Sequence, residues 1–137
     1  MLELKLYQTR VLDELRTFLT ELILLPPSRH RIQYAYMSQT PEEAGRYKPI
    51  PGLEQVPFIC IKVPTGGGKT LLASYSINEL SENYILDKNG KGLVMWFVPS
   101  DAIRTQTIEA LKNKNHPYRE LLDAKFDNKI KISLRRL

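Results

Sequence analysis

Cysteine is almost absent from this sequence: Cys60 is the only one among 137 residues. A single thiol excludes an internal disulfide and is typical of proteins kept in a reducing compartment. Long apolar runs are missing too, since none approaches the roughly 20 residues that cross a bilayer. The first ten residues, MLELKLYQTR, lack the basic head and apolar core of a signal peptide. We therefore expect a cytoplasmic protein without a membrane partner.

Residues for metal-ligand and nucleophile chemistry are equally scarce. The two histidines, His30 and His116, stand alone, and together with Cys60 they show no metal-ligand spacing. Spacing indicates no Ser–His–Asp arrangement either. Cys60 and Trp96 lie in apolar runs, where we expect both side chains to serve core packing. The sequence therefore predicts neither a metal centre nor a nucleophilic hydrolase.

Acidic residues are outnumbered, with 15 Asp and Glu against 20 Lys and Arg and a net charge of +5. From Asp101 onward the chain has nine Lys or Arg against five Asp or Glu. This excess is a mild indication of a polyanionic partner, because many solvated surfaces carry a similar balance.

The first 57 residues divide into a helix and an irregular stretch. Apolar residues at helical spacing predict an amphipathic helix over about residues 7–25, which Pro26-Pro27 ends. Residues 26–57 contain six prolines and no clear period, so we expect a loop or insertion, with a helical turn after Thr40. Aromatic and basic residues are interleaved there: Tyr34, Tyr36, Tyr47, Arg29, Arg31, Arg46 and Lys48. They either stack on nucleic acid or fasten the loop to the body of the protein, and we favour the second interpretation.

Residues 58–137 alternate between expected strands and helices. The apolar runs at 58–63 and 93–98 predict strands buried on both faces. A third strand is expected over 130–134, helices over 69–83, 101–114 (with Asp101 as cap) and 119–125, and a turn over 87–92. Strands that alternate with helices predict an α/β domain with a parallel sheet and right-handed crossovers.

The stretch VPTGGGKT, residues 63–70, has the composition of a phosphate-binding loop. Gly66, Gly67 and Gly68 permit backbone N–H groups to point inward, and the following helix start favours an anion. Lys69 would reach the terminal phosphates and Thr70 would help to hold Mg²⁺, with Thr65 completing the loop. The general P-loop pattern places glycine at position 63, where this chain has Val63. The expected ligands are therefore ATP and Mg²⁺.

The form Pro-Thr-Gly-x-Gly-Lys-Thr resembles the first motif of superfamily 2 helicases and translocases, in which that earlier glycine is often replaced. In that superfamily a strand followed by Pro and Ser or Thr lies against a nucleic-acid backbone. The resemblance assigns this role to Pro99 and Ser100, with Gln106 on the helix behind. A Tyr-Gln pair near the start of such helicases reads adenine through its glutamine, which is Gln8 here.

Three stretches together make the chain similar to the opening of the restriction (Res) subunit of type III restriction–modification enzymes. They are Val63–Leu72, Trp96–Thr107 and the run His116-Pro117-Tyr118-Arg119-Glu120-Leu121-Leu122-Asp123. The resemblance implies a RecA-like P-loop domain, here incomplete, with the N-terminal helix before it. It also implies an ATP-driven motor on double-stranded DNA, with a methyltransferase subunit as partner.

Such motors need an aspartate–glutamate pair after a hydrophobic strand to organise Mg²⁺ and activate water. The only adjacent Asp–Glu pair is Asp13-Glu14, inside the first predicted helix. We therefore expect residues 1–137 to be the N-terminal portion of a helicase ATP-binding domain, without turnover of its own. The alternatives are a nonfunctional fragment and a different P-loop nucleotide-binding module.

Overall fold

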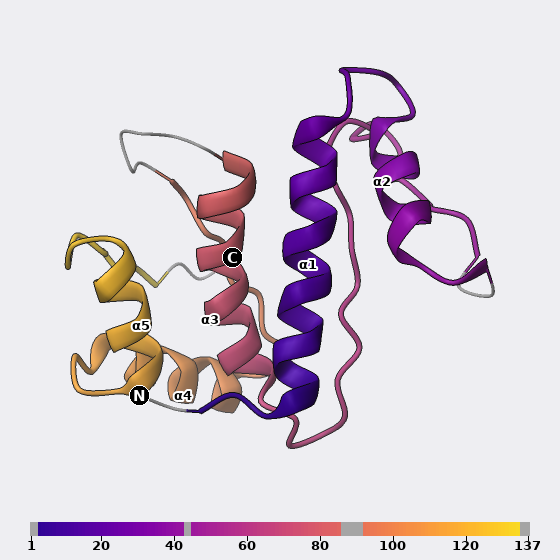
Figure 1. Ribbon diagram of the computed structural model, residues 1–137. Coiled ribbons are helices and arrows are strands. Elements are labelled where there is room, and N and C mark those ends of the chain that lie inside the picture. Colours follow the sequence, from indigo (N-terminus) through magenta and orange to yellow (C-terminus); the bar gives the residue numbers. More distant parts are fainter. Residues whose placement is uncertain (1–2, 43–44, 86–91, 135–137) are drawn as a thin grey trace.

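The structure is a computed structural model that describes residues 3–42, 45–85 and 92–134. Its secondary structure is helical: α1 (Leu6–Leu24), α2 (Arg31–Gln39), α3 (Lys69–Leu80), α4 (Asp101–Lys112) and α5 (Pro117–Lys125). A π-helical turn, Ser81–Ile85, continues α3. Figure 1 shows α1 in the middle, with α2 on one side of it, α3 on the other, and α4 and α5 beyond α3.

Helix α1 supplies most of the core. Its buried residues follow helical spacing: Leu12, Leu15, Phe18, Leu19 and Leu22. Four of them, from Leu15 onward, pack with Ile32 and Ala35 of α2. The helix ends before Pro26 and Pro27, which lack the N–H groups that a further turn would need. The predicted helix over 7–25 is confirmed.

Helix α2 lies inside the stretch that the sequence predicted to be a loop, so that prediction is wrong for residues 31–39. Its N-cap, His30, makes no side-chain capping bond, and only Ile32 and Ala35 are buried. The packing of these two side chains on α1 stabilises the helix, because the sequence of this segment favours a helix only weakly. The turn predicted after Thr40 falls partly on residues 43 and 44, which lie outside the described residues.

Two of the three tyrosines in this stretch fasten it to the body of the protein. The rings of Tyr36 and Tyr47 pack with centroids 5.5 Å apart, and both rest against the α1–α2 core. The Tyr47 hydroxyl also accepts the Phe58 N–H at 2.8 Å. Tyr34 is exposed. The packing interpretation therefore holds for Tyr36 and Tyr47.

The predicted α/β fold, an incomplete RecA-like domain with a parallel sheet, is wrong: no strand occurs within residues 3–42, 45–85 and 92–134. Residues 58–63 and 93–98 are extended but not paired, and residues 130–134 are irregular. The first segment runs beside α1 and α2, whereas the second lies against α3. A strand exists only where a second backbone supplies hydrogen-bond partners, and apolar composition does not supply one.

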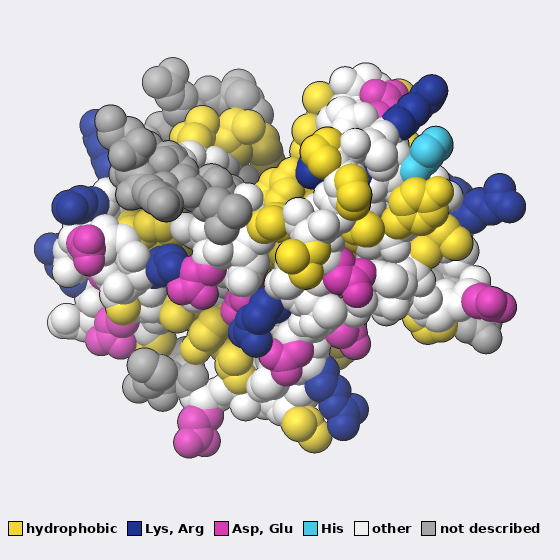
Figure 2. Space-filling model, turned by 45° about the horizontal axis from the view of Figure 1, so that its top comes forward, with side chains coloured by type: hydrophobic (Ala, Val, Ile, Leu, Met, Phe, Trp, Pro, Cys, Tyr) yellow, Lys and Arg dark blue, Asp and Glu magenta, His cyan; other side chains and the backbone are white. Residues whose placement is uncertain are grey.

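These extended segments are exposed, which corrects the expectation that they are buried. Phe58, Ile59, Leu93, Met95 and Phe97 all expose more than a third of their surface. Cys60 is an exposed thiol and not a core residue, while Trp96 is half-buried against α3. Figure 2 shows hydrophobic side chains at the surface beside basic and acidic ones. The turn predicted at 87–92 lies, except for Gly92, outside the described residues.

The two C-terminal helices begin with side-chain caps. Ser100 caps α4 by accepting the Ile103 N–H at 3.4 Å, so Asp101, the predicted cap, is the first helical residue. His116 caps α5 through its Nδ1, which accepts the Tyr118 N–H, and Pro117 takes the first helical position. Helix α3 has no side-chain cap, and its N-cap residue Gly68 is in the left-handed conformation. None of the helices described is long and apolar enough to span a membrane.

Helices α1 and α3 are joined by a charged pair in which the carboxylate is buried and the guanidinium is partly exposed. The Arg16 guanidinium donates to both carboxylate oxygens of Glu79, from Nε at 2.9 Å and from Nη2 at 2.8 Å. Glu79 is buried, and the Asn83 amide also donates to its carboxylate at 3.0 Å. These hydrogen bonds and the negative charge of Glu79 raise the pKa of Arg16 above its usual value. The pair fixes how α3 is placed along α1.

Replacing Arg16 tests this pair. Arg16→Met leaves the buried Glu79 carboxylate without its cation, so we expect the free energy of unfolding to fall by about 1–3 kcal/mol. Asp13→Ala is the control, because this exposed partner of Arg16 should contribute less than about 1 kcal/mol. Urea denaturation of both variants measures the difference. An equal fall in the free energy of unfolding for the two variants would show that the Arg16–Glu79 pair contributes no more than the exposed Arg16–Asp13 pair.

Candidate functional site

The glycine loop joins the extended segment 58–63 to α3. Gly66 has φ +76° and Gly68 has φ +79°, in the left-handed region that glycine enters without strain. Between them Gly67 is buried, and its N–H donates to the Pro64 carbonyl at 2.9 Å, which closes a turn. Thr65 is exposed at the outside of this turn. The loop therefore bends sharply into the first turn of α3.

Four consecutive N–H groups, those of residues 68–71, find no hydrogen-bond partner in the described part of the chain. The first intrahelical bond of α3 comes one residue later, from the Leu72 N–H to the Gly68 carbonyl at 2.9 Å. Free N–H groups at a helix start carry partial positive charge and suit an anion. No acidic residue lies in the first turn of α3 to take that place.

Lys69 and Thr70 follow at the first two positions of α3. The Lys69 amine is exposed and donates to the Pro64 carbonyl at 3.2 Å, so it folds back over the loop. Thr70 is half-buried, and its hydroxyl has no hydrogen bond among the described residues. One cation, one hydroxyl and four N–H groups are thus gathered around a single helix start. This set fits a polyphosphate with Mg²⁺. The Thr70 hydroxyl would be one ligand of the metal, and Mg²⁺ commonly takes water and phosphate oxygens as the remaining ligands.

The Tyr-Gln pair at the start of α1 touches this loop, although about 60 residues separate them in sequence. The Tyr7 hydroxyl donates to the Gly67 carbonyl at 2.7 Å, and the Gln8 amide nitrogen donates to the same oxygen at 3.0 Å. The other end of the Gln8 amide accepts the Lys5 N–H at 2.9 Å. Gln8 is buried with both ends of its amide bonded inside the protein.

The residues predicted to contact DNA lie elsewhere, at the start of α4. Pro99, Ser100 and Gln106 are all exposed. The Ser100 hydroxyl is engaged in capping α4, whereas the Gln106 amide has no hydrogen bond among the residues described. The structure thus brings Gln8 to the glycine loop, and it leaves Pro99, Ser100 and Gln106 each exposed.

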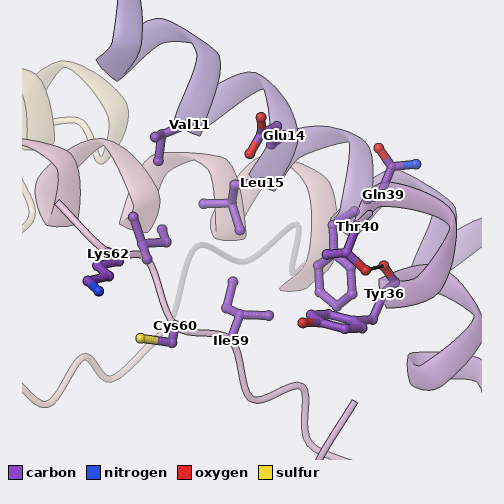
Figure 3. A pocket seen from close by; sticks show the side chains of 11 residues that line it. Val11, Glu14, Leu15, Tyr36, Gln39, Thr40, Ile59, Cys60 and Lys62 are labelled. Atoms are coloured by element: carbon purple, nitrogen blue, oxygen red, sulfur yellow. Dashed lines mark hydrogen bonds between the residues drawn. The ribbon is translucent and has the colours of Figure 1, made fainter. Parts of the chain in front are cut away.

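Two hollows of the surface lie away from the glycine loop. One, of about 230 Å³, lies between α1, α2 and the segment 58–63, and Figure 3 shows Leu15, Tyr36 and Ile59 around it with the Cys60 thiol pointing away. A second, of about 210 Å³, lies between α3 and residues 94–97. Neither of these two hollows is lined by residues 64–70.

The run from His116 to Asp123 has a structural role. Arg119 is buried, donates to the Leu111 carbonyl at 3.1 Å and to the Ile130 carbonyl at 3.3 Å, and lies 2.8 Å from the Asp123 carboxylate. It therefore ties the end of α4 and residue 130 to α5. Its burial and partners make this arginine unsuited to a ligand contact.

The residue that sequence reasoning missed is Tyr7. The resemblance to superfamily 2 helicases points to the Tyr-Gln pair but assigns a role only to Gln8. Nothing in the local sequence indicates that the Tyr7 hydroxyl meets a carbonyl 60 positions away.

One family model matches the chain, that of the type III restriction enzyme, res subunit, over residues 1–134. This chain belongs to that family. The membership confirms the resemblance drawn from the glycine loop and the two later stretches, and it makes the chain part of a helicase-like restriction subunit. No curated protein and no solved structure matches the chain.

Substituting alanine for each of two loop glycines distinguishes the cost of backbone strain from the cost of a steric clash with Gln8. Both Gly66→Ala and Gly68→Ala force a side chain into the left-handed region, at a cost of about 1–2 kcal/mol each. A Cβ at Gly66 meets open space, but one at Gly68 lies 2.6 Å from the Gln8 amide nitrogen. We expect Gly68→Ala to lower the unfolding free energy more than Gly66→Ala, as measured by urea denaturation. The reverse order would contradict the contact between Gln8 and the loop.

Proposed function

We propose that this chain binds the phosphates of ATP, with Mg²⁺, at the glycine loop of a helicase-like restriction subunit. The observation that supports this best is the row of four N–H groups without partners at the start of α3. Membership of the type III restriction enzyme family supports the same ligand.

Each loop residue has a role that its chemistry allows. Residues 65–68 form the cradle, because glycine leaves room for phosphate oxygens to approach the backbone. The Lys69 amine rests on the Pro64 carbonyl and would exchange this neutral partner for the β- and γ-phosphates. The Thr70 hydroxyl would join the ligands of Mg²⁺, and the metal would neutralise charge on the phosphates.

Binding is proposed here without turnover. Hydrolysis needs a carboxylate that orients water at the γ-phosphate. The only Asp–Glu pair, Asp13-Glu14, is exposed on α1, and Asp13 pairs with Arg16 at 2.9 Å. An adenine contact by Gln8 stays a prediction, since this amide would first have to leave the Gly67 carbonyl.

The second part of the proposal concerns DNA. Pro99 and Ser100 precede α4 and Gln106 lies in its second turn, all three exposed, and the resemblance to superfamily 2 motors assigns them to the backbone of double-stranded DNA. Contacts of this kind position a protein and read no sequence. We also propose, with family membership as the support, a methyltransferase subunit as partner and DNA-dependent ATP hydrolysis by an assembled motor.

Thermal unfolding with MgATP tests the nucleotide site. At a hundredfold excess over the Kd, a ligand of the folded state adds about 2.7 kcal/mol, or roughly 10 °C in Tm for a domain of this size. We expect this shift for the wild type and for Lys114→Ala, an exposed lysine outside the loop, and its loss in Lys69→Ala. A shift that persists in Lys69→Ala would refute the proposed phosphate site.

Fluorescence anisotropy with two duplexes of unrelated sequence tests the proposed DNA contact of Gln106. We expect Gln106→Ala to weaken the affinity for both duplexes by a similar factor, about three- to tenfold, which corresponds to one lost hydrogen bond. Gln55→Ala makes the same chemical change in the exposed proline-rich stretch and should leave both affinities unchanged. Equal effects of the two substitutions would argue against a specific contact by Gln106.

A further inference from the structure

The Gly67 carbonyl is the point at which the start of α1 meets the glycine loop. Two side chains donate to this one oxygen, the Tyr7 hydroxyl at 2.7 Å and the Gln8 amide at 3.0 Å. Both donors come from adjacent residues of the first turn of α1. Two donors from a well-anchored helix leave the carbonyl little freedom to rotate.

The orientation of that carbonyl also sets the orientation of the next N–H. The described chain has no cis peptide bond, so the Gly67 carbonyl and the Gly68 N–H point in opposite directions across one rigid plane. With the oxygen directed at Tyr7 and Gln8, the Gly68 N–H is directed away from them. This N–H is the first of the four without partners.

Glycine is needed on both sides of this peptide, for two different reasons. A Cβ on Gly67 would clash within the loop, at 2.8 Å from the Pro64 oxygen and 2.9 Å from Val63 Cγ1, and it would lie 3.3 Å from the Tyr7 hydroxyl. A Cβ on Gly68 would lie 2.6 Å from the Gln8 nitrogen. The peptide therefore fits between the loop and Gln8 only without side chains.

We propose that Tyr7 is a positioning residue of the phosphate site: its hydroxyl, together with the Gln8 amide, holds the Gly67 carbonyl and so directs the Gly68 N–H at bound phosphate. This inference rests on the proposed binding of nucleotide phosphates at the loop. Tyr7 does not touch the ligand; it acts through the Gly67–Gly68 peptide.

The role has a distinctive consequence for ligand preference. A residue that orients a backbone N–H toward phosphate affects every ligand that carries the polyphosphate, whatever its base. A residue that contacts adenine affects ATP alone. Removing the Tyr7 hydroxyl should therefore weaken MgATP, MgGTP and magnesium tripolyphosphate by the same factor.

The experiment compares Tyr7→Phe with the wild type by isothermal titration calorimetry, using these three probes. We expect Tyr7→Phe to weaken all three by about three- to tenfold, which corresponds to the effect of one hydrogen bond. Tyr34→Phe is the matched control, because it removes a hydroxyl from an exposed tyrosine on α2, and it should bind all three as the wild type does. Duplex DNA affinity should be unchanged in both variants.

A second measurement needs no ligand. Hydrogen exchange at the Gly67 amide, which is bonded to the Pro64 carbonyl, followed by NMR in the wild type and in Tyr7→Phe, reports whether the loop is held. We expect Tyr7→Phe to speed exchange at Gly67 more than at the amides of α5. This readout separates local release of the loop from a general loss of stability, which would speed exchange in both places.

The outcomes are distinct. Wild-type affinity of Tyr7→Phe for tripolyphosphate, or unchanged exchange at Gly67, would overturn the role of Tyr7 while Lys69-dependent binding of ATP still stands. A loss for ATP alone would likewise overturn it, since Tyr7 would then act on the base. A wild-type protein that binds none of the three probes would refute the proposed function itself, and this inference with it.

Discussion

The apolar stripe of α1 is the interaction on which the rest of the molecule depends. Its leucines and Phe18 bury one face of a 19-residue helix, against which α2 and α3 pack from different sides. The segment 58–63 also runs along α1, which delivers the chain to the glycine loop at the start of that helix (Figure 1). Without this stripe the loop and the Tyr-Gln pair would not meet. The placement of the glycine loop is therefore a consequence of how one helix packs.

Two kinds of polar contact refine this packing. The Arg16–Glu79 pair sets how α3 lies along α1, and the Gly67 carbonyl joins the start of one helix to the entrance of the other. Both are at partly or fully buried positions, where a lost partner costs more than it does in water. They fix the loop relative to α1 at two places. A loop held in this way presents its free N–H groups without first having to be ordered, which favours ligand binding.

Local sequence predicted the helices better than the strands, for a physical reason. A helix satisfies its hydrogen bonds within one segment, so the spacing of Leu12, Leu15 and Leu19 is enough to indicate it. A strand takes its partners from another segment, and the run at 93–98 cannot indicate whether one is present. Helix α2 was missed for the opposite reason, because its few apolar residues form a helix only against α1. The cap of α4 was predicted at Asp101, one residue after the serine that provides it, which is within the ordinary uncertainty of helix ends.

The sequence by itself determined the glycine loop with its lysine and threonine, the end of α1 before Pro26 and the family to which the chain belongs. These features depend on residue types in consecutive positions, where glycine, lysine and proline act through their own chemistry. Only the tertiary structure decided that Gln8 and Tyr7 hold the Gly67 carbonyl, that Cys60 is exposed, and that the apolar runs remain unpaired. Each of these depends on contacts between segments far apart in the chain. Such contacts follow from the packing of the whole core, which no single stretch of sequence encodes.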